Sequence, residues 1–584
     1  MARGPARAVM TDPGLAMNRR LLLPWLLSGA NAALALAAWT RQPWANGPAE
    51  WRWEYLRPGG LAAGGAGGAA GAVLAASLAG LGLLWGHRRL AAWRGAPPLA
   101  VACGAAFTFA LVAAQPGGWA RVAAALVSRN GFGYVWDAAL APPAGALLAD
   151  YPAASAGLNQ HSLTHPPGAL LAARALGRLD RVLPAPKARG AGGLAVSDGG
   201  GRLPELAAAA IAREVRRARA HGRPVPQPPP GPWAVTALAL LLPALSALAA
   251  WPLYLLARRW GWERRAALLA ALLWLLAPAR SLFTPSLDQA LPALLVGAAW
   301  LAADGRWTRA AAAGALLFAA CFLSYGCLAA LPLVAACAAV AGPPAPGRGE
   351  EMGAADGSLL RPGLQLTGTE ADLPLEPGRA RTTDAAGSPQ RPAAEPTGAA
   401  TALRQGSGYT RTAATAAAAW QRWGSLALGF ALPYLVLAIA AGHDPWHALR
   451  TALALHHRIA VAPRSYAAWL LWNPYDFALL LSPAVLGLAA AALARPCRRA
   501  RWRLAAFAWW GSLGLLLLSG GVRGEVGRIW LIWMPFACLF AAGAAAHSDT
   551  GDAERAGWQA GVAWVLATEA LLTLALGASM VFVT

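Results

Sequence analysis

Charged side chains are scarce in this 584-residue chain, and lysine is almost absent. Only 13% of the residues are charged and 57% are hydrophobic, whereas soluble domains carry about a quarter charged residues. Lys187 is the only lysine, so arginine supplies nearly all of the positive charge behind the net +22. We interpret this bias as the mark of a GC-rich genome. Because no basic stripe interleaves with a soluble fold, the charge does not indicate a nucleic-acid partner.

Cysteine is also scarce and is poorly placed for metal or disulfide chemistry. Five of the six cysteines lie in apolar segments, and Cys497 lies in an arginine-rich loop. The chain has no Cys-x-x-Cys motif, so the sequence predicts neither a disulfide framework nor a structural zinc site. No small-residue cleavage site follows the first apolar run. We interpret that run as a retained helix rather than a signal peptide.

Long apolar runs are what the chain has in abundance. A helix of about 20 residues crosses a hydrocarbon core about 30 Å thick, and many runs reach or approach that length. We therefore predict an all-α polytopic membrane protein with about thirteen transmembrane helices. The expected spans are 21–39, 61–85, 98–114, 233–257, 265–283, 289–303, 309–325, 327–342, 423–441, 475–494, 504–519, 529–546 and 558–583.

Arginine-rich short loops predict the orientation of these spans, since such loops stay in the cytoplasm. They place the N-terminus inside and leave outside 40–60, 115–232, the turns near 284–288 and 326, 442–474 and 520–528. The predicted organisation is an N-terminal two-helix extension (1–97), a transmembrane core (98–342) whose large outside loop (115–232) follows the third span, a disordered cytoplasmic loop (343–422), and a C-terminal transmembrane part (423–584).

The stretch His161–Gly168 interrupts the apolar sequence with a rigid polar turn. Pro167 lacks a backbone N–H, and its ring disfavours helical geometry at Pro166, so a helix has to end before them. His161 and His165 are then held in a fixed loop. The pair either hydrogen-bonds the turn, contacts a substrate or phosphate, or binds a metal.

Other conspicuous polar residues fall on the same predicted face. Carboxylates there suit a general base or a metal, and arginines with tyrosine and histidine bind phosphate through charge-assisted hydrogen bonds. Charges at the membrane edge are costly unless paired or hydrated, which makes them functional candidates. The candidates are Asp137 and Asp150 for catalysis, and Tyr134, His161, His165, Asp288, Arg464, Tyr466, Asn473, Glu525 and Arg528 for substrate or phosphate binding, with no metal ligand assigned.

Each candidate also has a structural interpretation that the sequence leaves open. Asp137 is either a capping or solvated carboxylate or a base, and Asp150 is either a turn residue or a base. Asp288 either caps the helix that follows it or belongs to the site. Arg523–Arg528 either forms a salt-bridged turn or binds substrate, and the pair His456–His457 is either solvated or metal-binding.

In order and content these motifs resemble bacterial membrane glycosyltransferases of the GT-C superfamily, near the protein mannosyltransferase and aminoarabinose transferase relatives. The resemblance covers about 98–546, with the predicted disordered loop as an insertion. The motifs that carry it are the acidic outside loop with Asp137 and Asp150, then Thr164–Gly168, Phe283–Asp288, Arg464–Tyr466, Trp472–Phe477 and Gly524–Trp530 leading into Pro535.

The resemblance implies a GT-C-like fold and inverting transfer of a sugar from a polyprenyl-phosphate donor at the extracytoplasmic face. An acidic residue of the first large outside loop would be the base, a role carried onto Asp137 first and Asp150 second. Arg464, Arg528 and His165 would hold the departing phosphate. The implied partners are the lipid-linked sugar, membrane lipid and an envelope glycan, lipid or protein acceptor. Dependence on a divalent metal stays open.

Two other functions stay open. A transporter or flippase of a lipid-linked envelope precursor predicts discontinuous helices and charges at mid-membrane depth, whereas here the charges gather at one face. A non-catalytic relative or scaffold would make the motifs accidental. In the leading interpretation the protein is a multi-pass cell-membrane protein with its N-terminus in the cytoplasm and its active site outside.

Overall fold

The computed structural model describes residues 13–46, 54–55, 93, 95–115, 117–128, 132–186, 202–341, 398–494, 500–546 and 552–581. The chain divides into two units, one formed by Met1–Ala341 with Arg422–Thr584 and the other by Gly342–Gln421. In the second unit, the structure describes only the beginning of α20, a continuous helix over Gly398–Ala441. The end of the loop predicted to be disordered is therefore helical. The predicted span 61–85 and residues 343–397 lie outside the described residues.

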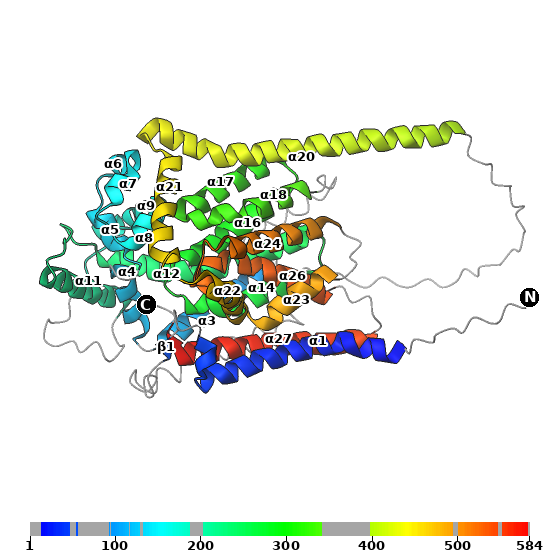
Figure 1. The fold of residues 1–584 in the computed structure, drawn as a ribbon, viewed down its shortest axis with the longest axis horizontal. Coiled ribbons are helices and arrows are strands. Elements are labelled where there is room, and N and C mark those ends of the chain that lie inside the picture. The colour runs from blue at the N-terminus through cyan, green and yellow to red at the C-terminus, as the bar shows by residue number, and fades with distance from the viewer. Residues whose placement is uncertain are drawn as a thin grey trace, which may run out of the picture. The chain divides into compact units, whose positions relative to one another are not determined.

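Helices form almost all of the described chain, as predicted (Figure 1). The segments before residue 230 are α1 (Pro13–Trp39), a 3-10 turn (Pro43–Asn46), β1 (Glu54–Tyr55), α3 (Ala96–Ala114), α4 (Gly118–Val127), α5 (Tyr134–Leu140), α6 (Ala144–Ala149), α7 (Tyr151–Ser155), α8 (Gln160–Thr164), α9 (Gly168–Leu176), α10 (Leu179–Val182) and α11 (Leu203–Ala220). The middle segments are α12 (Pro232–Leu248), α13 (Ala250–Arg259), α14 (Arg264–Leu276), α15 (Pro278–Leu282), a 3-10 turn (Leu287–Ala290), α16 (Leu291–Ala302), α17 (Trp307–Leu323), a 3-10 helix (Tyr325–Ala330) and α18 (Leu331–Ala339).

After α20 the chain continues with further helices and one short strand. These are α21 (Pro445–His456), a π-helical turn (His457–Val461), α22 (Tyr466–Leu481), α23 (Pro483–Ala494), α24 (Ala500–Ser519), α25 (Val526–Ile529), a 3-10 turn (Trp530–Trp533), α26 (Met534–Ala546), α27 (Asp552–Ser579) and β2 (Met580–Val581). The two-residue strands β1 and β2 pair antiparallel.

Fewer helices than predicted reach the length and apolar character of a membrane span in the part of the chain that the structure describes. Among the described residues, six helical stretches are long and apolar enough to cross a membrane, or seven if one bent pair counts as a span. The predicted thirteen is therefore not confirmed. Several expected spans are shorter in the structure, because apolar runs conceal breaks. The predicted span 289–303 holds only the 12-residue α16, and 327–342 begins with a 3-10 helix before α18.

Prolines divide two of the expected spans. The predicted helix 475–494 is two helices, α22 and α23, bent by 105° at Ser482. The predicted helix 265–283 is divided at Ala277, between α14 and α15. In both cases the break is the residue before a proline, where the ring disfavours helical geometry. Pro483 and Pro278 then begin the next helix, a position where the missing N–H costs nothing.

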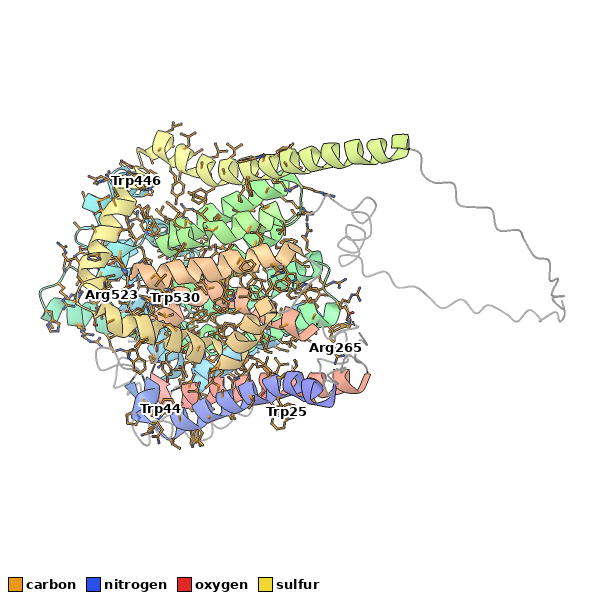
Figure 2. All side chains as sticks on the ribbon, turned by 45° about the vertical axis from the view of Figure 1, so that its right-hand side comes forward. Trp25, Trp44, Arg265, Trp446, Arg523 and Trp530 are labelled. Carbon is orange, nitrogen blue, oxygen red and sulfur yellow. The ribbon has the colours of Figure 1, made fainter. Side chains whose placement is uncertain are left out.

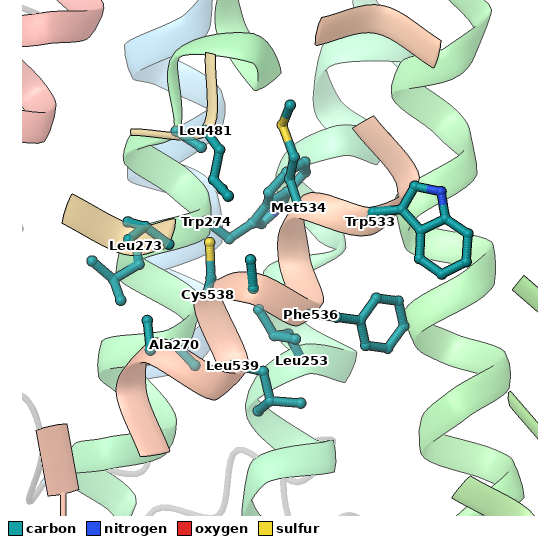
Figure 3. Packing of buried hydrophobic residues seen from close by; sticks show 14 of the residues in the cluster. Leu253, Ala270, Leu273, Trp274, Leu481, Trp533, Met534, Phe536, Cys538 and Leu539 are labelled. Atoms are coloured by element: carbon teal, nitrogen blue, oxygen red, sulfur yellow. The ribbon is translucent and has the colours of Figure 1, made fainter. Parts of the chain in front are cut away.

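The apolar core lies between helices from both ends of the chain. α1 runs alongside α27 (Figure 1), and a Cβ on Gly561 would come within 2.9 Å of Pro24, so glycine allows this close packing. α14 packs against α26, where Trp274 meets Met534 and Cys538 (Figure 3). The indole N–H of Trp274 donates to the Ser246 carbonyl at 2.8 Å, so its polar atom is satisfied inside this core.

Polar loops of the first unit collect at two opposite ends. Figure 2 shows Arg265 at one end and Arg523 at the other. At the Arg265 end, Asp304 pairs with both Arg259 and Arg309, so loops that were all predicted to face the cytoplasm meet there. The other end carries the segments predicted to lie outside, which form the site described next.

Candidate functional site

The stretch His161–Gly168 forms a helix end and a turn, as the prolines predict, but His161 lies in α8 and only His165 lies beyond the helix, so the predicted loop is shorter than expected. α8 ends just before His165, whose backbone is extended (φ −112°, ψ 159°), and α9 begins at Gly168. The Nδ1 atom of His165 lies 2.9 Å from the His161 carbonyl oxygen. A Cβ on Gly168 would come within 2.0 Å of the Phe322 carbonyl oxygen, so only glycine lets α9 pack this closely on α17.

Asp137 anchors this turn from α5. Its side chain is completely buried, and its Oδ2 accepts hydrogen bonds from the Asn159 N–H at 2.9 Å and the Ser162 hydroxyl at 2.7 Å. Asn159 in turn caps α8, because its Oδ1 accepts from the Ser162 N–H at 3.0 Å. The carboxylate therefore fixes where α8 presents the histidines. Its role as a base stays a prediction.

Arg528 is the centre of an ion-pair network. Its Nη2 lies 2.5 Å from Oε2 of Glu525, and its Nε lies 3.6 Å from Oδ2 of Asp288. Arg464 approaches the other oxygen of Glu525 at 3.5 Å. Two guanidinium groups and two carboxylates balance in charge, which buried ion pairs require if they are not to carry a large desolvation penalty. The network therefore joins segments that were predicted to be separate outside turns.

An unusual turn presents Glu525 to the arginines. Glu525 has φ +58° and follows Gly524 at φ +88°, and a residue other than glycine adopts this region at a cost of about 1–2 kcal/mol. Asn473 holds the turn: its Oδ1 accepts from the Gly524 N–H at 3.1 Å, and its Nδ2 donates to the Val522 carbonyl at 2.8 Å. Asn473 thus positions the turn that carries Glu525. None of its described hydrogen bonds reaches an arginine side chain.

A row of rings lies beside Arg528. The guanidinium carbon of Arg528 lies 5.4 Å from the centre of the Phe132 ring, a cation–π distance. Phe132 and His161 have ring centres 5.6 Å apart, His161 and His165 6.3 Å, and His165 and Tyr134 6.1 Å. Both histidines of the motif therefore lie in the same cluster as the arginines.

Burial holds both histidines neutral. Burial, together with the nearby Arg528 and His165 charges, lowers the pKa of His161 to about 3. Burial also lowers the pKa of His165, although Asp288 opposes it. For Glu525, burial alone would raise the pKa, but Arg528 and Arg464 outweigh it and lower the pKa. The site thus holds neutral imidazoles beside an ionised carboxylate.

Two candidates lie apart from the Arg528 network. Asp150 is exposed and caps α7, with its Oδ1 accepting from the Ala153 N–H at 3.2 Å. Tyr466 donates its hydroxyl to the Leu518 carbonyl at 2.8 Å and lies under Arg523, 5.4 Å from the guanidinium carbon to the ring centre. No described hydrogen bond or ion pair joins either side chain directly to Arg528.

Asp288 is not the cap that one interpretation expected. Ser286 takes that position, since its Oγ accepts from the Asp288 N–H at 3.2 Å and donates to Asp288 Oδ2 at 2.8 Å. The sequence shows this only in retrospect: Ser286 and Gln289 have the spacing of a capping box. Asp288 is thereby oriented toward Arg528 as a site residue.

Ser162 and Phe132 belong to the cluster although the sequence did not single them out, and His456, expected to be either solvated or metal-binding, also lies there. Ser162 binds Asp137, Phe132 contacts Arg528, and His456 is half-buried with its Nε2 at 3.2 Å from the Gly521 carbonyl oxygen. Burial lowers the pKa of His456. Ser162 lies inside the histidine motif and could have been found there. No sequence signal distinguishes Phe132 from an ordinary core aromatic.

The acidic side chains of the Arg528 network are already paired with an arginine. No group of three or more histidine, cysteine or acidic side chains placed to hold a metal occurs in the part of the chain that the structure describes. Asp288 and Glu525 already pair with Arg528, so a cation between them would have to displace it.

No family model, curated protein or solved structure matches this chain.

Proposed function

We propose that this chain is a membrane glycosyltransferase that moves a sugar from a polyprenyl-phosphate donor to an acceptor at the extracytoplasmic face. One observation carries the proposal: Arg464, Arg528, His161 and His165 meet at one end of an apolar helical bundle, although they are distant in sequence. A lipid-linked phosphate has the matching chemistry, a charged head at the membrane surface and an apolar tail.

The cluster offers cationic and neutral donors to the phosphate. Arginine binds phosphate through planar, charge-assisted hydrogen bonds, and we assign the phosphate contact to Arg464, which pairs with Glu525 at 3.5 Å and also donates to the Arg523 carbonyl. A bound anion reverses the local field at His161 and His165 and favours their protonated forms. Phosphate binding is therefore expected to draw protons onto the histidines.

The proposed reaction has a simple balance. The acceptor oxygen forms a bond to C1 of the sugar while the bond from C1 to the phosphate oxygen breaks. The phosphate leaves with the electron pair beside Arg464 and the histidines, and a carboxylate takes the acceptor proton. We assign the base to Asp137 from the family resemblance. For this the Oδ2 of Asp137 has to exchange its hydrogen bond with Ser162 for the acceptor proton.

Turnover by the purified protein in nanodiscs tests the proposal. Wild-type protein is mixed with a polyprenyl-phosphate sugar and envelope acceptors, and released polyprenyl phosphate is measured. Asp137→Asn keeps an oxygen that can accept from Asn159 and Ser162, so the anchor remains while the basicity is lost. We expect its turnover to fall by about 100-fold or more. Ser162→Ala is the matched control, because it weakens the anchor but keeps the base.

Two outcomes would reject parts of the proposal. Equal turnover in wild type, Asp137→Asn and Asp150→Asn would remove both proposed bases. Absence of polyprenyl phosphate release by the wild type with every donor and acceptor supplied would remove the transferase itself and favour a non-catalytic role.

A specific observation also favours a second candidate, a transporter or flippase of a lipid-linked precursor. The bent span at Ser482 is a discontinuous helix, and Asp476 and Glu569 are acidic residues buried within helices. Both features are typical of transporters. Movement of a labelled lipid-linked precursor across protein-containing vesicles, without release of polyprenyl phosphate, would support this candidate over the enzyme.

A further inference from the structure

Glu569 is an acidic residue in the apolar core, far along the chain from the proposed site. It lies in α27 within the candidate span Ala560–Ser579, and its side chain is completely buried. Neither carboxyl oxygen has a hydrogen-bond partner within the described residues. Val565, Leu566, Leu572 and Leu576 of the same helix belong to the main apolar core, and Thr573, one turn further on, donates to the Leu276 carbonyl at 2.7 Å.

The surroundings of Glu569 provide no compensating charge. Of the helices packed against α27, α15 carries the buried Arg280, whose guanidinium donates to the Leu275 and Gly104 carbonyls and leaves Nη1 without a hydrogen-bond partner among the described residues; no described ion pair joins it to Glu569. α14 carries Arg264 and Arg265 only at its first residues, and the described side chains of α1 and α23 include no charged group. Cys538 of α26 is the titratable group within electrostatic reach.

An ionised carboxylate without a partner is very costly in such a place. Desolvation of an unpaired ion costs several kcal/mol or more, so the group takes up a proton instead. A methionine or leucine would fill the same space without leaving polar atoms unsatisfied. Packing alone therefore does not explain a glutamate here.

The neighbouring residue Thr568 belongs to a group of hydrogen bonds at the bend between α22 and α23, which we call the polar tie and which joins Asn31, Ser482 and Thr568. Asn31 of α1 is buried, and its Nδ2 donates to Ser482 Oγ at 2.9 Å and to Thr568 Oγ1 at 3.4 Å. Its Oδ1 accepts from the Ala484 N–H at 3.2 Å. Asn31 thus satisfies the first turn of α23 and joins it to α27. Ser482 itself has φ +97°, a conformation that costs on the order of 1–3 kcal/mol outside glycine.

We propose that Glu569 is an intramembrane proton-binding site placed one residue from the tie that holds the bent span. In the packing seen here the carboxyl group is neutral. Release of the proton requires water to enter beside α27, which separates α27 from its neighbours and loosens the tie through Thr568. The ligand is a proton, and the site does not depend on glycosyl transfer.

Carbodiimide labelling of the wild-type protein in nanodiscs tests the proposal directly. Dicyclohexylcarbodiimide partitions into the membrane and reacts with protonated carboxyl groups, whereas a water-soluble carbodiimide reaches exposed ones such as Asp444. We expect mass spectrometry to find the apolar adduct on Glu569 at neutral pH. The water-soluble reagent should label Asp444 and leave Glu569 unmodified.

Infrared spectroscopy provides a second measurement that does not depend on reagent access. The wild type should show a protonated-carboxyl carbonyl band at neutral pH that disappears in Glu569→Gln and persists in Asp444→Asn. A carboxylate band assigned to Glu569 at neutral pH would overturn the proposal, as would the absence of apolar labelling on the wild type. Labelling of the wild type, located by mass spectrometry, remains decisive even if Glu569→Gln fails to fold.

Discussion

At the scale of single residues, Asp137 and Arg528 have separate tasks in one cluster. Asp137 holds α8 through Asn159 and Ser162. Arg528 neutralises Glu525 and Asp288. Asp137 sets where the histidines lie. Arg528 acts on their charge state, because burial and then the Arg528 charge disfavour the imidazolium form.

Removing Arg528 is expected to destabilise the protein. Arg528→Met leaves Asp288 without its cation and Glu525 with only the longer contact to Arg464, and removing one partner of a buried pair costs about 3–5 kcal/mol. Glu525→Gln added to Arg528→Met should restore part of that loss, because one of the two carboxylate charges disappears. Thermal unfolding in detergent at neutral pH measures both. The single variant Glu525→Gln is measured beside them. If the loss in the double variant equals the sum of the losses in the two single variants, Arg528 and Glu525 are not coupled.

His161 should make the protein sensitive to acid. Its pKa is about 3 in the folded protein, below the ordinary value of 6.5 for a histidine. In that interval the unfolded chain binds a proton that the folded protein does not, so stability falls as pH drops below about 6.5. His161→Asn should therefore lose less thermal stability than the wild type between neutral pH and pH 5. An identical pH profile for the two proteins would contradict the assignment.

The sequence predicts the histidine turn well, because the rule behind it is local. Pro166 and Pro167 forbid a helix, whatever surrounds them. The partners of Asp137 and Asp288 could not be predicted in the same way. Asp137 binds Asn159 and Ser162 from the loop that follows it, whereas Asp288 lies beside Arg528, more than two hundred residues away, and both contacts exist only in the folded chain.

At the scale of elements, apolar composition predicts helices but conceals where they break. The runs 265–283 and 475–494 are both apolar enough to be continuous, yet Pro278 and Pro483 begin new helices within them. Those prolines were visible in the sequence. The 105° bend at Ser482 was not, because it is held by Asn31 from the other end of the chain.

Close packing of α20 on α17 depends on Gly429 of α20 and Gly314 of α17. A Cβ at Gly429 would lie 2.0 Å from the Ala311 carbonyl oxygen, whereas at Gly424 nothing lies within 4 Å. Gly429→Ala should force the helices apart and cost about 1–3 kcal/mol. Gly424→Ala, the control on the same helix, should be neutral or slightly stabilising because alanine favours helix. Thermal unfolding compares them, and equal effects would show that the contact is unimportant.

At the scale of the whole molecule, loops grouped by the arginine pattern also meet in space. Asp304 joins Arg259 and Arg309 at one end, and Glu525 joins Arg464 and Arg528 at the other. The grouping was predictable because short loops on one face of a bundle have to lie near one another. The individual pairs within each group were not, since they depend on how the helices pack. The orientation in the membrane stays a prediction.

Cysteine labelling tests that orientation. Arg219 at the end of α11 and Arg264 at the start of α14 are both exposed. With Cys103 and Cys497 replaced by serine, Arg219→Cys should react with an impermeant maleimide in intact cells. Arg264→Cys should react only after the membrane is opened. The reverse pattern would place the site in the cytoplasm.

Binding of polyprenyl phosphate to the purified protein tests the central claim most directly, that segments distant in sequence form one lipid-phosphate site. Calorimetric titration compares the wild type with Arg464→Gln, and with Arg458→Gln as a control at an exposed arginine nearby. We predict binding that tightens as pH falls, a loss of about tenfold or more in Arg464→Gln, equivalent to about 1.4 kcal/mol, and no change in Arg458→Gln. Equal affinity in all three proteins, independent of pH, would contradict the account.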